Sequence, residues 1–130
     1  VGSFGLECIS RKASHVTFVE SYSKTLKILQ TNLEKLSSQK NYKILTDDIF
    51  ENNFFKNLNC KYNIIFLDPP YKEKKIKDLL NNIHKEKILE DNGLIVIHRN
   101  KKDKDEFPPN FKIIDEKIYG ISKIFFGVLN

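Results

Sequence analysis

The chain has 130 residues, of which 40% are hydrophobic and 30% are charged, and its net charge is +5. That length suits one domain around one core, and no apolar run approaches the roughly 18 residues that a transmembrane helix needs. The charge favours a polyanionic partner such as nucleic acid, but a general abundance of lysine explains it equally well. Cys8 and Cys60 lack metal-ligand spacing and have hydrophobic neighbours, which predicts buried, reduced thiols in a cytoplasmic protein.

Short β-rich segments alternate with helical segments along the chain. A β-branched run predicts a strand over His15–Glu20, and leucines at helical spacing predict a helix over Ser21–Leu36. The elements expected after these are a strand over Tyr42–Thr46, a short helix over Ile49–Leu58, a strand over Tyr62–Asp68, a helix over Lys74–Leu89, a turn at Asp91–Gly93, a strand over Leu94–Arg99, and two strands within Phe111–Leu129 joined near Tyr119–Ser122.

Two of these segments carry more specific expectations. The run Tyr62–Asp68 is continuously apolar, which is typical of a strand covered on both faces. The segment Arg99–Asn110 mixes charges of both signs, so we expect a mobile surface loop there.

Strands alternating with helices predict an α/β fold with a mostly parallel sheet, helices on both faces and a C-terminal antiparallel hairpin at one edge. Ligands of such sheets bind at the carboxyl ends of the strands. Three of the four expected strand ends carry a carboxylate, which favours a ligand with hydroxyl or amine groups. These strand ends are Glu20, Asp47 or Asp48, Asp68, and His98 or Arg99.

Gly2 and Gly5 stand just before a helix-like run. Glycine lets a backbone turn tightly and approach a ligand at a helix start, although an ordinary cap explains a lone G-x-x-G equally well. Glu20 follows at close to the ~20 residues at which an acidic residue meets ribose hydroxyls in dinucleotide-type folds. In combination, the glycines and Glu20 favour ribose binding over a solvated strand end.

Asp47 and Asp48 follow the next strand, and adjacent side chains point in different directions. We therefore expect one of them to face the ligand and the other to cap the segment from Ile49 onward. Asp48 is favoured for the ligand because an aliphatic residue follows it.

The sequence Asp68-Pro69-Pro70-Tyr71 ends a strand in a rigid corner, because neither proline has an N–H for a ladder or a helix. A carboxylate, a backbone carbonyl near Pro69 and an aromatic face at fixed angles suit an exocyclic amine on a planar ring. The amine would donate to Asp68 and to that carbonyl, while the ring stacks on Tyr71 as flipped bases do. The corner predicts catalysis by positioning, without a covalent enzyme intermediate.

This corner resembles the (D/N)PP(Y/F/W) motif of S-adenosylmethionine-dependent amino methyltransferases. The stretch GSFGLECISRKASHVTFVE, Gly2–Glu20, is similar to the G-x-x-G-L-E-A-x-S-R-G-A-x-x-V-x-x-(V/I)-E stretch of bacterial 16S ribosomal RNA guanine-N2 methyltransferases. The order of the motifs, the alternating body and the closing hairpin also match, so the resemblance covers nearly the whole chain. It implies a Rossmann-like class I fold and S-adenosylmethionine as the cofactor.

The resemblance also implies a role for each matching residue. Gly2, with Gly5, would lie around the methionine part of the cofactor, Glu20 would hold its ribose, and Asp48 or Asp47 would meet its adenine amine. Asp68, Pro69, Pro70 and Tyr71 would hold the target guanine N2 beside the methyl group, with Asp68 also next to the cofactor. The implied product is N2-methylguanine in ribosomal RNA or the small ribosomal subunit, made by a monomer without metal or membrane.

The family's first strand and the opening of its cofactor loop correspond to positions before Val1. We therefore expect a fragment that lacks a central strand and an upstream basic RNA-binding segment, and that binds cofactor poorly. Unpaired backbone groups between His15–Glu20 and Tyr62–Asp68 would be costly if buried.

Rival functions keep the fold and change the substrate or the chemistry. They are amino methylation of DNA adenine or protein glutamine, a non-catalytic RNA-binding scaffold and, last, a nicotinamide dehydrogenase, which leaves the Asp68–Tyr71 corner unexplained. His98 is the one histidine near the proposed site, and the sequence assigns it no role. Lysines within Tyr71–Lys77 would touch phosphates or simply solvate a helix start.

Overall fold

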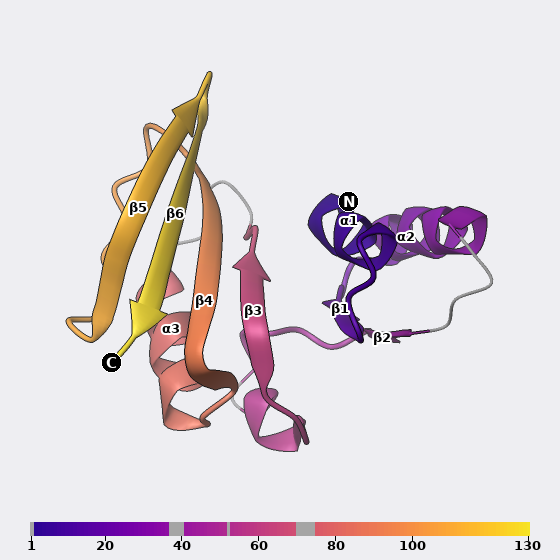
Figure 1. The fold of residues 1–130 in the computed structure, drawn as a ribbon, viewed down its shortest axis with the longest axis horizontal. Coiled ribbons are helices and arrows are strands. Elements are labelled where there is room, and N and C mark those ends of the chain that lie inside the picture. Colours follow the sequence, from indigo (N-terminus) through magenta and orange to yellow (C-terminus); the bar gives the residue numbers. More distant parts are fainter. Residues whose placement is uncertain (1, 37–40, 52, 70–74) are drawn as a thin grey trace. The chain divides into compact units, whose positions relative to one another are not determined.

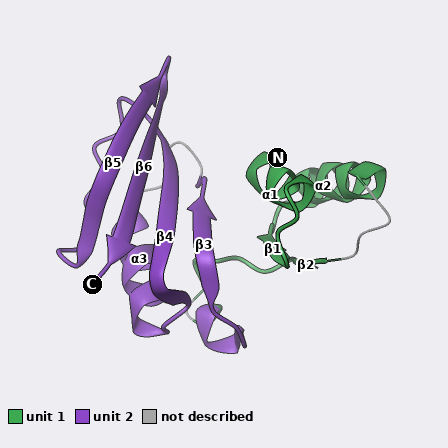
Figure 2. Ribbon diagram, in the orientation of Figure 1, with its two compact units in different colours: residues 1–54 green, residues 55–130 purple. Residues whose placement is uncertain are grey.

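The computed structural model describes residues 2–36, 41–51, 53–69 and 75–130 (Figure 1). The chain divides into two compact units, residues 1–54 and 55–130, which are coloured separately in Figure 2. The single domain expected from the length stays a prediction.

The first unit pairs two helices with a small parallel sheet. Strand β1 pairs in parallel with β2, from Val16 opposite Tyr42 to Val19 opposite Leu45. A core of Ile9, Phe18, Leu29 and Leu33 joins the helices to β1. The expected strands and helix are confirmed, with slightly shorter ends. The elements are α1 (Ser3–Ser10), β1 (Val16–Val19), α2 (Ser23–Leu36) and β2 (Tyr42–Leu45).

The two N-terminal glycines allow close packing in this unit. Gly2 precedes α1 with a φ of 64°, a left-handed conformation that favours glycine. Gly5 lies inside α1, so the expectation that both glycines precede the helix is wrong. A Cβ on Gly2 would lie 2.8 Å from Leu29 Cδ1, and one on Gly5 would lie 2.8 Å from Phe18 Cζ. Because neither glycine has a side chain, α1 can pack closely against the core of the first unit.

The second unit is a four-stranded mixed sheet in the order β3-β4-β6-β5. Strand β4 runs parallel to β3 and antiparallel to β6, and β5 is antiparallel to β6. The expectation of a mostly parallel sheet is therefore wrong, because the closing hairpin pairs directly with β4. The hairpin itself, at the edge of the sheet, is confirmed. The elements are η1 (Phe55–Asn57), β3 (Tyr62–Leu67), α3 (Ile76–Lys85), β4 (Leu89–Asn100), β5 (Phe111–Tyr119) and β6 (Ser122–Leu129).

Helix α3 supplies much of the core of this unit. It runs behind the four-stranded sheet in Figure 1, and its core-facing side chains are buried. Ile95 and Ile97 of β4 are fully buried as well. Coverage of the sheets by helices on both faces stays a prediction. The buried residues of the α3 segment are Ile76, Leu79, Leu80, Ile83 and Ile88.

The helix expected over Ile49–Leu58 is wrong. Only the three residues Phe55–Asn57 form a helical turn, of the 3-10 type. The Asp48 carboxylate Oδ1 accepts the backbone N–H of Phe50 at 2.9 Å. Such local side-chain bonds compete with an α-helix, and they explain why an apparently helical pattern forms turns instead.

Strands β3 and β4 differ from the expectations in two ways. Ile64 of β3 is 50% exposed, so the strand is not covered on both faces. The segment Asp91–Gly93 does not turn the chain but lies inside β4. There β4 advances from Leu89 to Leu94 while β3 advances only from Tyr62 to Ile64, which makes a bulge.

Two other expectations concern cysteines and membranes. Both cysteines are free thiols, but Cys60 is exposed and Cys8 is only partly buried, so the prediction of two buried thiols is wrong. Among the helices that the structure describes, none is long and apolar enough to cross a membrane.

Candidate functional site

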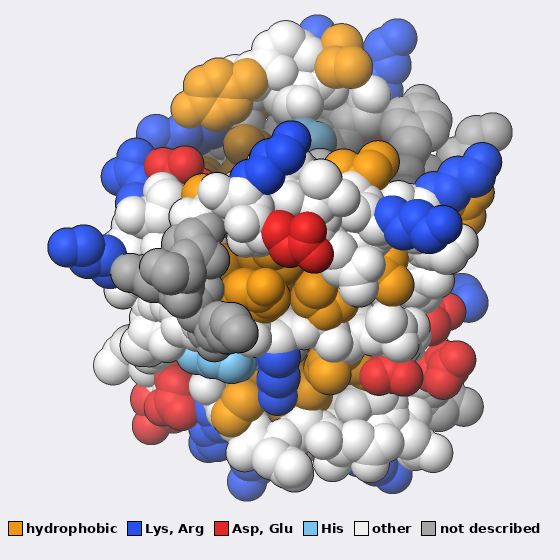
Figure 3. All heavy atoms as spheres, turned by 90° about the vertical axis from the view of Figure 1, so that its right-hand side faces the viewer, with side chains coloured by type: hydrophobic (Ala, Val, Ile, Leu, Met, Phe, Trp, Pro, Cys, Tyr) orange, Lys and Arg blue, Asp and Glu red, His pale blue; other side chains and the backbone are white. Residues whose placement is uncertain are grey.

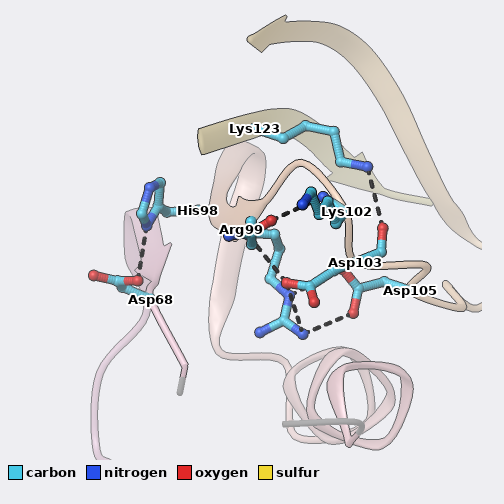
Figure 4. A network of polar contacts seen from close by, with 8 residues as sticks. Asp68, His98, Arg99, Lys102, Asp103, Asp105 and Lys123 are labelled. Carbon is cyan, nitrogen blue, oxygen red and sulfur yellow. Dashed lines mark hydrogen bonds and ion pairs between the residues drawn. The ribbon is translucent and has the colours of Figure 1, made fainter. Parts of the chain in front are cut away.

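Asp68, the first residue after β3, lies beside His98 near the carboxyl end of β4. The parallel register sets Leu67 opposite Ile97, so the next residues, Asp68 and His98, are neighbours. His98 Nδ1 lies 2.9 Å from Asp68 Oδ1 (Figure 4). An ionised carboxylate only accepts hydrogen bonds, so the imidazole Nδ1–H is the donor. This pairing joins the expected catalytic corner to a histidine to which sequence patterns assign no role.

A third strand holds the other side of the same imidazole. Ser122 pairs with Asn100, and Ile124 pairs with His98, so Ser122 is a diagonal neighbour of His98 on the same face. Ser122 Oγ lies 2.9 Å from His98 Nε2. When the ring is neutral, the serine hydroxyl donates to Nε2 while Nδ1–H donates to Asp68. Residues after β3, on β4 and at the start of β6 are thus linked in one chain of hydrogen bonds.

This chain of hydrogen bonds is open to solvent at its acidic end. The Asp68 side chain is 58% exposed and that of His98 is 34% exposed. The second carboxylate oxygen of Asp68 points away from the imidazole in Figure 4. Pro69 directly follows Asp68, whereas Pro70 and Tyr71 lie outside the described residues. An accepting oxygen is therefore left to face a ligand, and the stacking assigned to Tyr71 stays a prediction.

The loop after β4 is fastened by a buried arginine. Arg99 is 3% exposed, and its guanidinium donates from Nε and Nη2 to the two carboxylate oxygens of Asp105 at 2.9 and 3.0 Å (Figure 4). Asp103 lies 3.6 Å from the same guanidinium. The expectation of a surface loop over Arg99–Asn110 is therefore wrong at Arg99, Asp103 and Asp105, because these paired charges are largely buried. The sequence contains a signal for this pairing. Arg99 lies at the end of a buried strand, and aspartates follow it four and six residues later.

The charges that remain outside on this loop are mostly positive. Lys101, Lys102, Lys104 and Glu106 are exposed, while the two aspartates of the loop face Arg99. On the face shown in Figure 3, lysine and arginine side chains are scattered among acidic ones and do not gather into one basic patch.

Three of the four acidic residues expected near the cofactor, Glu20, Asp47 and Asp48, lie in the first unit, and Asp68 lies in the second. Glu20 follows β1, and its N–H donates to Leu45 O at 2.9 Å, which extends the ladder with β2 by one step. Its carboxylate accepts the N–H of Tyr22 at 3.3 Å. Asp47 and Asp48 follow β2 and are exposed. These carboxylates therefore gather at the carboxyl edge of the parallel β1–β2 pair.

Asp48 has the local role expected of one member of the Asp47–Asp48 pair, because its carboxylate caps the turn at Phe50. Which of the two meets a ligand stays a prediction. In the described part of the chain, no three His, Cys, Asp or Glu side chains form a group that could hold a metal ion.

Comparisons with known proteins show which family this chain resembles. The ribosomal RNA small subunit methyltransferase D of Buchnera aphidicola is 32% identical over 121 residues, which cover 90% of this chain and 60% of that protein. A conserved hypothetical protein of Streptococcus pyogenes has the same fold with a TM-score of 0.86 and 26% identity, over 99% of this chain and 80% of that one. A putative methylase of Haemophilus influenzae matches with a TM-score of 0.80 and 26% identity, over 99% and 81% of the two chains.

The chain spans about three fifths of the length of curated relatives that it matches. The resemblance to bacterial small-subunit ribosomal RNA methyltransferases is confirmed by these relatives. A family model described as Conserved hypothetical protein 95 matches residues 1–128. Because this match covers nearly the whole chain, the chain belongs to the Conserved hypothetical protein 95 family.

Proposed function

We propose that the protein is an S-adenosylmethionine-dependent methyltransferase that modifies the exocyclic N2 amine of a guanine in small-subunit ribosomal RNA. The observation that carries the proposal is Asp68, held by His98 at the carboxyl end of β3, in a chain whose relatives include ribosomal RNA small subunit methyltransferase D. An acidic strand end of this kind suits an amine because its free oxygen can only accept a hydrogen bond.

The hydrogen-bond acceptors at the β1–β2 edge fit the cofactor. A ribose diol and an adenine amine both donate hydrogen bonds, and Glu20, Asp47 and Asp48 are the acceptors that follow these two strands. We assign Glu20 to the ribose and Asp48 or Asp47 to the adenine amine, in a Rossmann-like class I arrangement, with Gly2 and Gly5 near the methionine part. The bound cofactor would supply the methyl group.

Asp68 then has a positioning task. Its carboxylate, with the backbone carbonyl near Pro69, accepts both N–H groups of the target amine and so aims the nitrogen lone pair away from the base ring. Tyr71 stacks on the base. Most of the rate gain from such a corner comes from orientation, since the target amine itself supplies the attacking lone pair.

The exposed lysines of the loop after β4 support a nucleic acid as the partner. Lys101 and Lys102 directly follow Asn100, which is two residues beyond His98. Contacts of lysine with phosphates position a strand without reading its sequence. We therefore propose ribosomal RNA or the small ribosomal subunit as the partner of a monomeric protein in the cytoplasm.

The test is a transfer experiment with the full-length gene product. Labelled S-adenosylmethionine is offered with small ribosomal subunits, with DNA or with a protein extract, and the label in each polymer is counted. We expect label in RNA, and its loss in the Asp68→Ala variant. Asp91→Ala is the matched control, because Asp91 is an exposed aspartate of the same unit inside the β4 bulge.

Other outcomes of this experiment separate the rival functions. Label only in DNA or protein would keep the amino methylation and replace the substrate. Transfer to none of the three, with no cofactor bound by the full-length protein, would favour a non-catalytic RNA-binding scaffold.

A further inference from the structure

We propose that His98 is a positioning residue of the methyl-transfer site, and that it fixes the Asp68 carboxylate with the support of Ser122. The proposal rests on the function proposed above and deepens it, since it explains how an exposed carboxylate keeps one orientation. The juxtaposition of residues from three strands carries it, at 2.9 Å for each of the two imidazole contacts.

Among the residues that the structure describes, it is His98 that contacts the Asp68 side chain. Asp68 is the first residue beyond β3, and more than half of its side chain is exposed. A carboxylate in this position would rotate freely, and an amine acceptor that rotates gives little orientation to its ligand. The contact with His98 engages Oδ1 and leaves Oδ2 toward solvent, so one rotamer is selected.

His98 is itself held on its far side. Its backbone belongs to the central strand β4, which is paired to β3 on one side and to β6 on the other. Ser122 on β6 contacts Nε2, so the ring cannot flip without losing a hydrogen bond. A histidine whose second nitrogen is engaged has its tautomer and its ring orientation set by that partner. The strand pairing of the mixed sheet thereby sets the orientation of Asp68.

The kinetic test compares substitutions that keep one nitrogen of the imidazole at a time. The Asn side-chain amide can take the place of Nδ1, and the Gln amide can take the place of Nε2. With the full-length gene product, we expect His98→Ala to lower kcat for RNA methylation about 10- to 100-fold while KM changes less than about twofold. His98→Asn should restore most of kcat, whereas His98→Gln should be as slow as His98→Ala.

Ser122→Ala removes the hydroxyl that supports the His98 ring but leaves the contact between His98 and the Asp68 carboxylate. We expect a smaller fall in kcat than for His98→Ala, again with little change in KM. Thermal melting of each variant checks that the fold is intact. The proposal is overturned if folded His98→Ala keeps the wild-type kcat, or if His98→Asn is as slow as His98→Ala.

A second readout needs no activity. Nitrogen-15 NMR of the histidine side chains reports which ring nitrogen carries the proton. In the wild-type protein, His98 should be protonated on Nδ1, and Asp68→Ala should move the proton toward Nε2. His84 is the internal control, because its Nε2 contacts Asn130 O and it should not respond.

The NMR result keeps the two proposals distinguishable. If the wild-type protein methylates no RNA, the proposed function fails, and the tautomer of His98 still decides whether it holds Asp68. An unchanged His98 tautomer in Asp68→Ala would refute the positioning role, even in an active enzyme.

Discussion

The buried pair of Arg99 and Asp105 should contribute strongly to the stability of the second unit. The side chains are 2% and 6% exposed, and the contact is bidentate, so Asp105→Asn would leave a buried guanidinium short of its charge partner. Breaking a buried pair by removing one partner costs about 3–5 kcal/mol. Asp103 remains 3.6 Å from the guanidinium and compensates in part, so we expect a loss of about 2–3 kcal/mol.

The measurement is hydrogen exchange at increasing urea, read by mass spectrometry on peptides from β4 and β6. These peptides report the free energy of unfolding of the second unit by itself, which a whole-chain signal would mix with that of the first. Glu7→Gln, read on peptides from α1, is the comparison for an exposed contact of the same kind, that of Arg11 at 2.7 Å, whose side chains are 79% and 60% exposed. It should have no measurable effect on stability.

A double variant tests the physical reason for the loss. Arg99→Met with Asp105→Leu removes both charges and keeps similar volume, so most of the stability should return. A change of less than about 0.5 kcal/mol in Asp105→Asn would refute a contribution from the buried pair. A double variant no more stable than Asp105→Asn would show that the unpaired charge is not the cause.

Two further predictions concern the first unit and the thiols. Gly5→Ala gains about 1 kcal/mol of helix propensity but crowds the Phe18 ring at a cost of about 1–3 kcal/mol. We therefore expect a net loss of stability, measured as faster hydrogen exchange in α1 peptides. Phe18→Leu in the same chain should then relieve it, and no relief would contradict the packing argument. Burial raises the pKa of the Cys8 thiol, so less of it is thiolate at pH 8. Exposed Cys60 should be alkylated first, as measured by peptide mass spectrometry, and faster labelling of Cys8 would contradict this reasoning.

Local patterns predicted most of the strands and helices of this chain. The alternation at β1, the leucine spacing of α2 and the hairpin of β5 and β6 are properties of short segments. The elements that they predict are confirmed. The segment after β2 was misread, because the hydrogen bond from Phe50 N–H to the Asp48 side chain replaces a helical one.

Long-range pairing was beyond such patterns. The mixed sheet depends on β6 pairing with β4, which no local period reveals. The same holds for the candidate site. Sequence patterns predict a role for Asp68 and place His98 at a strand end. Their contact, and that with Ser122, follow only from the register of three strands, and the burial of Arg99 follows from partners in a loop that reads as surface.

The central claim is that the Asp68 corner presents a guanine N2 amine for methylation. The most direct test is to digest RNA from reactions of the full-length protein with unmethylated small ribosomal subunits and to identify the methylated nucleoside by mass spectrometry. We expect N2-methylguanosine with the wild-type protein and none with Asp68→Ala. A different methylated nucleoside, or the same yield from Asp68→Ala, would contradict the account.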